Sequence, residues 1–135
     1  MSDDGGESAC WAHLMDEMDT RGPARRVAEV DLALVPDDGR GAVWSLPHDG
    51  DLDANLVRLP PGQQIDQHVN NEVDVFVVVM EGDGDLLVDD REVRLAPGVA
   101  VLIPRGCGRT IRAGAGPLRY FTVHRRRDPL AIRPR

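Results

Sequence analysis

The chain has 135 residues, which suits one domain with a hydrophobic core and is too short for two domains of ordinary size. Its net charge of −7 argues against nucleic acid as the main partner, because binding to phosphates requires a positive surface. The longest apolar run, residues 75–80, is far shorter than the roughly 20 residues that span a bilayer, so we expect no membrane partner. The N-terminus is acidic without an apolar stretch, and the two cysteines lie far apart, so we predict a cytoplasmic protein.

The first 26 residues are predicted to form a tail followed by a short helix. Residues 1–8 are small and acidic, so we expect them to be disordered. Over residues 9–18 the apolar side chains recur at helical spacing, as Trp11, Leu14, Met15 and Met18. We therefore predict a short amphipathic N-terminal helix that packs on the following domain or on a second subunit.

Residues 27–126 carry short apolar segments that alternate with turn residues about every 8–12 positions, the spacing of a β-sandwich or barrel. The predicted strands cover residues 30–35, 43–46, 56–59, 73–80, 86–88, 93–95, 99–103, 109–113 and 118–124. No long helical pattern separates these strands, so the sequence predicts an all-β fold and not a parallel α/β sheet. Because residues 73–80 are apolar at both odd and even positions, we expect a strand buried on both faces.

Charge is unevenly distributed along the chain. Most acidic residues lie in the first 90 positions, most arginines follow them, and residues 127–135 form a basic C-terminal tail. A tail of this kind can bind an anion or a partner, or it can pair with the acidic N-terminal half within a subunit or across a dimer. We favour the second interpretation, because surfaces of mixed sign are normal and the stretch is short.

Two stretches resemble the sequence motifs of the cupin superfamily. The first cupin motif is G-x5-H-x-H-x3/4-E-x6-G, and the second is G-x5-P-x-G-x2-H-x3-N. The positions that match are Gly62, His68, Gly82, Gly98, Pro104 and Gly106. The resemblance covers about half of the chain, from Asn55 to His124. It implies the cupin fold, an all-β double-stranded β-helix similar to a jelly-roll barrel.

The resemblance also implies a metal site, which in the family is formed by the two His, the Glu and the His of the second motif. This sequence keeps only His68 of that set. Asn70 replaces the second His, and Arg109, a permanent cation, stands at the position of the second-motif His. The Glu position falls on Val75 or, with the shorter spacing, on Asp74. We therefore predict that the chain has no conventional metal site.

A displaced metal site remains an alternative to this prediction. It would hold a divalent transition metal at His68 with Glu72, Asp74 and His124, and it would make the chain a cupin enzyme of the metal-dependent dioxygenase or isomerase/epimerase type. Without a metal, His68 and Asp74 are the candidate acid–base pair.

Arg109 suggests a different use of the barrel. It shares a strand face with Ile111 and Ala113, so strand parity directs it inward. A buried Arg needs a partner. That partner is either Asp74 or Glu72, which would plug the barrel, or the carboxylate or phosphate of a ligand.

The last predicted strand presents a polar set and an apolar set. Tyr120, Thr122 and His124 share one face, and Phe121 and Val123 share the other. We favour the outer, solvated face for the polar set, because such alternation is ordinary for a half-buried strand. A place in the cavity beside His68 is the alternative.

The strand that holds His68 is not oriented by parity alone. Residues 66, 68 and 70 alternate with residues 65, 67 and 69, and only the resemblance places His68 inside. The predicted ligand-binding residues are His68, Asn70, Asp74, Arg109 and His124. We predict that the barrel binds a small polar or anionic molecule, and that edge strands pair two copies into a homodimer.

Overall fold

The computed structural model describes residues 27–47 and 50–126. The helix predicted over residues 9–18 and the basic tail predicted over residues 127–135 lie outside the described residues. Within the described part, no helix has the length and hydrophobicity that a membrane crossing requires. The cytoplasmic location stays a prediction.

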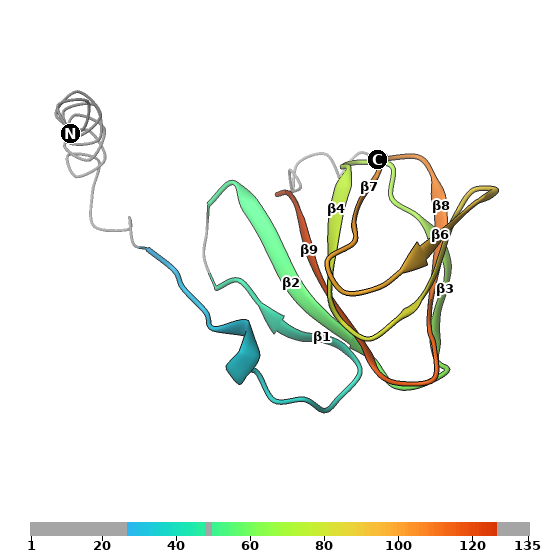
Figure 1. Cartoon of the computed structure of the whole chain (residues 1–135). Helices are drawn as coiled ribbons and strands as arrows, with labels where there is room; N and C mark the ends of the chain where they lie inside the picture. Colours follow the sequence, from blue (N-terminus) through green and yellow to red (C-terminus); the bar gives the residue numbers. More distant parts are fainter. Residues whose placement is uncertain (1–26, 48–49, 127–135) are drawn as a thin grey trace, which may run out of the picture. The chain divides into compact units, whose positions relative to one another are not determined.

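The chain divides into two compact units, residues 1–30 and 31–135. The strands that the structure describes lie in the second unit and form two antiparallel sheets (Figure 1). The five-stranded sheet has the order β1 (Gly41–Ser45), β2 (Leu52–Leu59), β9 (Leu118–Arg125), β4 (Val75–Glu81) and β7 (Ala100–Ile103). The four-stranded sheet has the order β3 (Gln64–Val69), β8 (Gly108–Ala113), β5 (Gly84–Val88) and β6 (Arg91–Leu95). The all-β architecture predicted from the sequence is confirmed.

The strand predicted over residues 30–35 is wrong. The structure has a short 3-10 helix there, Leu32–Leu34, and Asp31 precedes it as the N-cap. The Asp31 carboxylate accepts a hydrogen bond of 3.0 Å from the backbone N–H two residues later, which favours a turn over extended backbone. Arg119 of β9 donates from Nη2 to the carbonyl oxygen of Leu32 at 2.9 Å, so this turn is tied to the five-stranded sheet.

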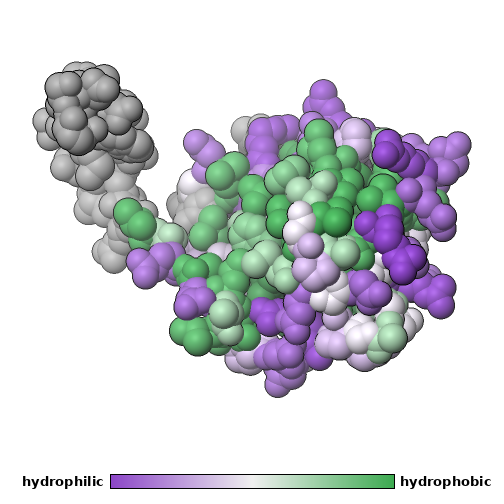
Figure 2. Space-filling model, viewed as in Figure 1, coloured by the Kyte–Doolittle hydropathy of each residue, from purple (hydrophilic) through white to green (hydrophobic). Residues whose placement is uncertain are grey.

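Strand β4 is buried on one face only, which corrects the prediction of burial on both faces. Val75, Val77 and Val79 are at most 3% exposed, whereas Phe76 and Met80 are 44% and 43% exposed. The valines point between the sheets, and the alternate residues lie on the outer face of their sheet. A continuous apolar run in the sequence therefore fits two kinds of strand. One is buried on both faces, and the other is buried on its inner face and exposes apolar residues on its outer face. The surface accordingly carries apolar patches among its charged side chains (Figure 2).

The hydrophobic core lies between the two sheets and takes side chains from both. Its buried members are Leu59, Val73, Val75, Val77, Val79, Leu86, Leu95, Ile103, Ile111, Ala113, Leu118 and Tyr120. Full burial of a Val, Leu or Ile side chain is worth about 1.5–3 kcal/mol, so the inner faces of the sheets supply most of the driving force for closing them together. These rigid inner faces also position the side chains of the candidate site.

A one-residue register shift interrupts the pairing of β3 with β8. Ile65 pairs with Ile111 and His68 pairs with Arg109, so β3 contains one more residue between these pairs than β8 does. A β-bulge of this kind reverses the alternation of side chains along the bulged strand. As a result, Ile65 and Asn70 both line the space between the sheets although they have opposite parity.

Candidate functional site

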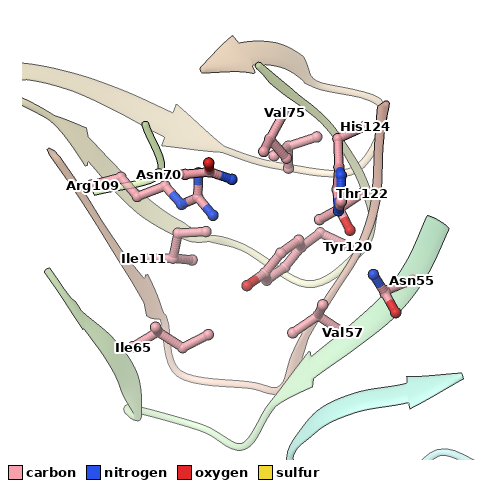
Figure 3. Close-up of a pocket in the computed structure, with 11 residues that line it drawn as sticks. Asn55, Val57, Ile65, Asn70, Val75, Arg109, Ile111, Tyr120, Thr122 and His124 are labelled. Carbon is pink, nitrogen blue, oxygen red and sulfur yellow. The ribbon is translucent and has the colours of Figure 1, made fainter. Parts of the chain in front are cut away.

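A cavity of about 200 Å³ lies between the two sheets (Figure 3). The residues that line it are Asn55, Val57, Ile65, Asn70, Val75, Val77, Arg109, Ile111, Tyr120, Thr122 and His124. A cavity of about 150 Å³ is large enough to bind benzene, so this one suits a short-chain acid or a molecule with one substituted ring. Its mixture of apolar walls and a few convergent polar groups is typical of small-molecule sites.

Asn70 has a fixed amide orientation. It is 8% exposed and lies just after β3, where its Oδ1 accepts hydrogen bonds from the backbone N–H groups of Glu72 at 2.9 Å and Val73 at 3.3 Å. A backbone N–H only donates, so the atom that faces these groups must be the oxygen. The Nδ2 atom is buried without a hydrogen-bond partner among the described residues, and Figure 3 shows it on the cavity side.

Arg109 lines the cavity next to Asn70, as Figure 3 shows. It comes from β8, and its neighbours of the same parity, Ile111 and Ala113, are buried. The inward direction predicted from strand parity is therefore confirmed. The described residues that line the cavity include no Asp or Glu, so the fixed charge of the lining is positive.

The structure corrects the predicted orientation of β9. Tyr120, Thr122 and His124 all line the cavity, although the alternation of polar and apolar residues favoured an outer face for them. The reason lies on the other side of the sheet. There the ring of Phe121 stacks on Trp44 of β1, with ring centroids 6.2 Å apart, so Phe121 is covered from outside the barrel.

Two polar side chains on the β2–β9 wall also have defined hydrogen-bonding roles. His124 Nδ1 lies 2.9 Å from the carbonyl oxygen of Arg125. Asn55 Oδ1 accepts a hydrogen bond of 2.6 Å from the hydroxyl of Ser45. In Figure 3 the Asn55 nitrogen faces the cavity, and His124 lies across the cavity from Arg109.

Tyr120 places a neutral phenol in the cavity wall. The residue is 3% exposed. Burial raises the pKa of its hydroxyl to about 12, and the nearby charge of Arg109 opposes this rise only in part. Near neutral pH the hydroxyl therefore stays protonated and can both donate and accept a hydrogen bond.

Tyr120 is the only tyrosine of the chain, so its titration can be followed without ambiguity. Because the folded pKa lies above the unfolded value of about 10, the stabilisation is complete below pH ~10 and is lost as pH rises through about 12. We expect a loss of about 3 kcal/mol in the free energy of unfolding over this window. Denaturant unfolding at several pH values measures it, with Tyr120→Phe as the control that lacks this loss. A phenolate midpoint near 10 in the folded protein would contradict the assignment.

Asp74 and His68 belong to the predicted ligand-binding set and are not among the lining residues that the structure describes. Asp74 is exposed and does not line the cavity, because Val75 takes the inward position at the start of β4 and the preceding residue points elsewhere. Its Oδ1 accepts a hydrogen bond of 2.9 Å from the backbone N–H of Arg105. His68 is the backbone partner of Arg109 in the β3–β8 ladder, and its side chain lies outside the described part of the structure.

The comparison with protein families agrees with the motifs and the fold. A family model described as the cupin domain matches residues 55–124, slightly more than half of the chain. The chain belongs to the cupin family. A comparison with curated proteins found no match.

Several solved structures have a similar fold. KdgF from a Halomonas species is 20% identical with a TM-score of 0.58, over 66% of this cupin and 81% of KdgF. TT1209 from Thermus thermophilus is 25% identical with a TM-score of 0.64, over 76% of this chain and 100% of TT1209. SPY1581 from Streptococcus pyogenes is 22% identical with a TM-score of 0.61, over 78% of this chain and 94% of its own. These likenesses show the fold.

The described side chains of this cupin do not fit the divalent metal that its family implies. Asn70 turns its oxygen to the backbone and its nitrogen to the cavity, and a neutral amide nitrogen does not coordinate a metal. Val75 stands at the Glu position, and Arg109 adds a permanent positive charge. In the described residues, no three His, Cys, Asp or Glu side chains group as metal ligands. The displaced site also loses Asp74, which lies outside the cavity.

Cys107 of this cupin does not have the properties of a nucleophile. Its thiol is half-buried, and the sequence places it between Arg105 and Arg109. Burial raises the pKa of the thiol, and a hydrogen bond to Asp89 and the charges of Asp89 and Asp74 raise it further. The unreactive thiol form is therefore favoured, and Cys107 acts as a small apolar side chain that packs against the core.

Proposed function

We propose that this cupin binds a small anionic molecule, most simply a carboxylate, in its barrel and does so without the metal ion of its family. The observation that carries the proposal is the fixed orientation of Asn70 beside Arg109. Both side chains present hydrogen-bond donors to the same part of the cavity, and neither presents an acceptor there.

The energetics of these donors favour an oxyanion. A buried N–H without a partner costs about 1–3 kcal/mol, so the Asn70 amide nitrogen is stabilised by an acceptor that enters the cavity. The guanidinium of Arg109 matches a carboxylate with two parallel hydrogen bonds. Apolar walls such as Val75 and Ile111 lower the local dielectric and strengthen this attraction.

The alternative function, a metal-dependent enzyme with a displaced site, has less support. It requires carboxylate ligands beside His68. The carboxylate of Asp74 is engaged with the backbone of Arg105 outside the cavity, and Glu72 is not among the described residues that line it. The acid–base pair of His68 and Asp74 meets the same difficulty. We therefore favour ligand binding.

The proposal is tested with a panel of carboxylates and their uncharged amides, for example benzoate and benzamide, titrated calorimetrically against the full chain. We expect the carboxylates to bind and the amides to bind at least tenfold more weakly, about 1.4 kcal/mol. The variant Asn70→Asp keeps the acceptor for the backbone of Glu72 and Val73 but replaces the donor with an anion next to Arg109. It should fold normally and lose at least tenfold in affinity for carboxylates.

The matched control is Asn71→Asp, which adds the same charge at the neighbouring exposed position. We expect its affinity for benzoate to stay within about twofold of the unaltered chain, because exposed charges are screened by solvent and salt. Equal losses in the two variants would mean that charge in general, and not the donor of Asn70, governs binding. If no carboxylate of the panel binds, the proposed function is wrong.

A further inference from the structure

The hydrogen bond of His124 fixes the proton position of its neutral ring. Nδ1 lies 2.9 Å from the carbonyl oxygen of Arg125, and a carbonyl oxygen only accepts. The proton of the neutral imidazole is therefore on Nδ1, and Nε2 carries a lone pair. Within the described part of the chain, Nε2 has no hydrogen-bond partner. His124 lines the cavity, and the ring nitrogen that is left without a partner is a hydrogen-bond acceptor.

The other polar groups of this wall differ from His124 in character. The hydroxyls of Thr122 and Tyr120 can both donate and accept. Asn55 directs its nitrogen to the cavity, because its oxygen accepts from the hydroxyl of Ser45. Nε2 of His124 is therefore the group on this wall that accepts a hydrogen bond without also being able to donate one.

The cavity consequently has two polar ends of opposite character. Arg109 and Asn70 offer donors on one wall, and His124 offers an acceptor on the wall across from them (Figure 3). Apolar side chains such as Ile111 and Val57 complete the lining. A ligand that complements both ends carries an anionic group at one end, an apolar body and a hydrogen-bond donor at the other end.

We infer that the ligand of this cupin is a small hydroxy acid whose carboxylate binds Arg109 and Asn70 and whose hydroxyl donates to Nε2 of His124. This inference rests on the proposed function and specifies its ligand class. A plain acid of the same shape leaves the acceptor of His124 desolvated and unpaired, and a site built to hydrogen-bond a hydroxyl discriminates against the analogue that lacks it.

The test compares matched acids on the full chain by calorimetric titration at one fixed, mildly alkaline pH. The pairs are benzoate with its meta- and para-hydroxy derivatives, and butanoate with its hydroxy derivatives. We expect at least one hydroxy acid to bind tenfold or more tightly than its parent. In His124→Phe this ratio should fall to about one, because the ring keeps its shape but offers no acceptor to the hydroxyl. His124→Asn, which can still donate to the carbonyl of Arg125, serves as a second variant if the first does not fold.

The outcomes separate this inference from the proposed function. If plain and hydroxy acids bind the unaltered chain equally well, the inference is wrong and the anion site stands. If the preference survives in the His124 variants, or is lost in Thr122→Val alone, another group receives the hydroxyl and the inference is also overturned. If neither plain nor hydroxy acids bind, both the proposed function and this inference are wrong.

Discussion

Replacing Arg109 by Met should reduce the affinity for carboxylates by about 30- to 1000-fold, equivalent to about 2–4 kcal/mol. The guanidinium supplies the charge and two hydrogen bonds to the ligand, and Met keeps most of its length without either. The matched control is Arg112→Met, three residues later on the same strand and exposed on its outer face. It removes the same charge from the chain but should change the affinity by less than about twofold. Calorimetric titration of both variants with benzoate measures the difference.

The same variant also tests whether Arg109 is needed for folding. We expect Arg109→Met to keep the fold, because the inner faces of the two sheets supply most of the apolar burial that stabilises it. The pKa of Tyr120 should rise further, because the charge of Arg109 lowers it. A marked loss of stability in Arg109→Met, without a change in benzoate affinity, would identify the residue as an internal plug of the barrel.

Gly82→Ala should destabilise the fold by about 2–5 kcal/mol. Gly82 has a φ of +86°, and a Cβ atom at this position would collide with the carbonyl oxygen of Pro117. Left-handed backbone costs a residue with a Cβ atom about 1–2 kcal/mol. The collision adds the cost of overpacking, about 1–3 kcal/mol, because the obstacle is backbone and cannot rotate away. Gly82 connects β4 to β5, which belong to different sheets, so this strain falls where the chain crosses from one layer to the other.

Gly98→Ala separates the two contributions. Gly98 has a φ of +90°, but nothing lies within 4 Å of the position that its Cβ atom would take. It should therefore show the backbone cost alone, about 1–2 kcal/mol. Denaturant unfolding of both variants gives the comparison. Equal destabilisation of the two variants would mean that the loop of Pro117 moves aside, so that the close approach at Gly82 adds no cost of its own.

The sequence predicted those features that depend on local chemistry. The turn glycines and the alternating segments were sufficient for the all-β fold, because the left-handed turns at Gly62, Gly82 and Gly98 disfavour any other residue type. The inward direction of Arg109 also followed from parity, since β8 continues without interruption through Ile111. In a strand without a bulge, side chains alternate between the two faces. The face of each residue can then be assigned once one residue of the strand is known to be buried.

Features that depend on contacts between distant segments were missed. The polar set of β9 faces inward because Trp44, far away in the sequence, covers Phe121 from outside. The amide of Asn70 is oriented by the backbone of the loop that follows it, and the residue type alone does not give that direction. The motif allows two spacings, which place either Asp74 or Val75 at the Glu position, and only the start of β4 at Val75 decides between them.

The extra residue in β3 has an evolutionary consequence. Substitutions along this strand change one side chain and leave the direction of every other unchanged. Deletion of a single residue between Ile65 and His68 would remove the bulge and turn one part of the strand over relative to the other. The wall that carries Asn70 would then present a different set of side chains in one mutational step. Length variation in this strand is therefore a short route by which related barrels can acquire or lose a binding site.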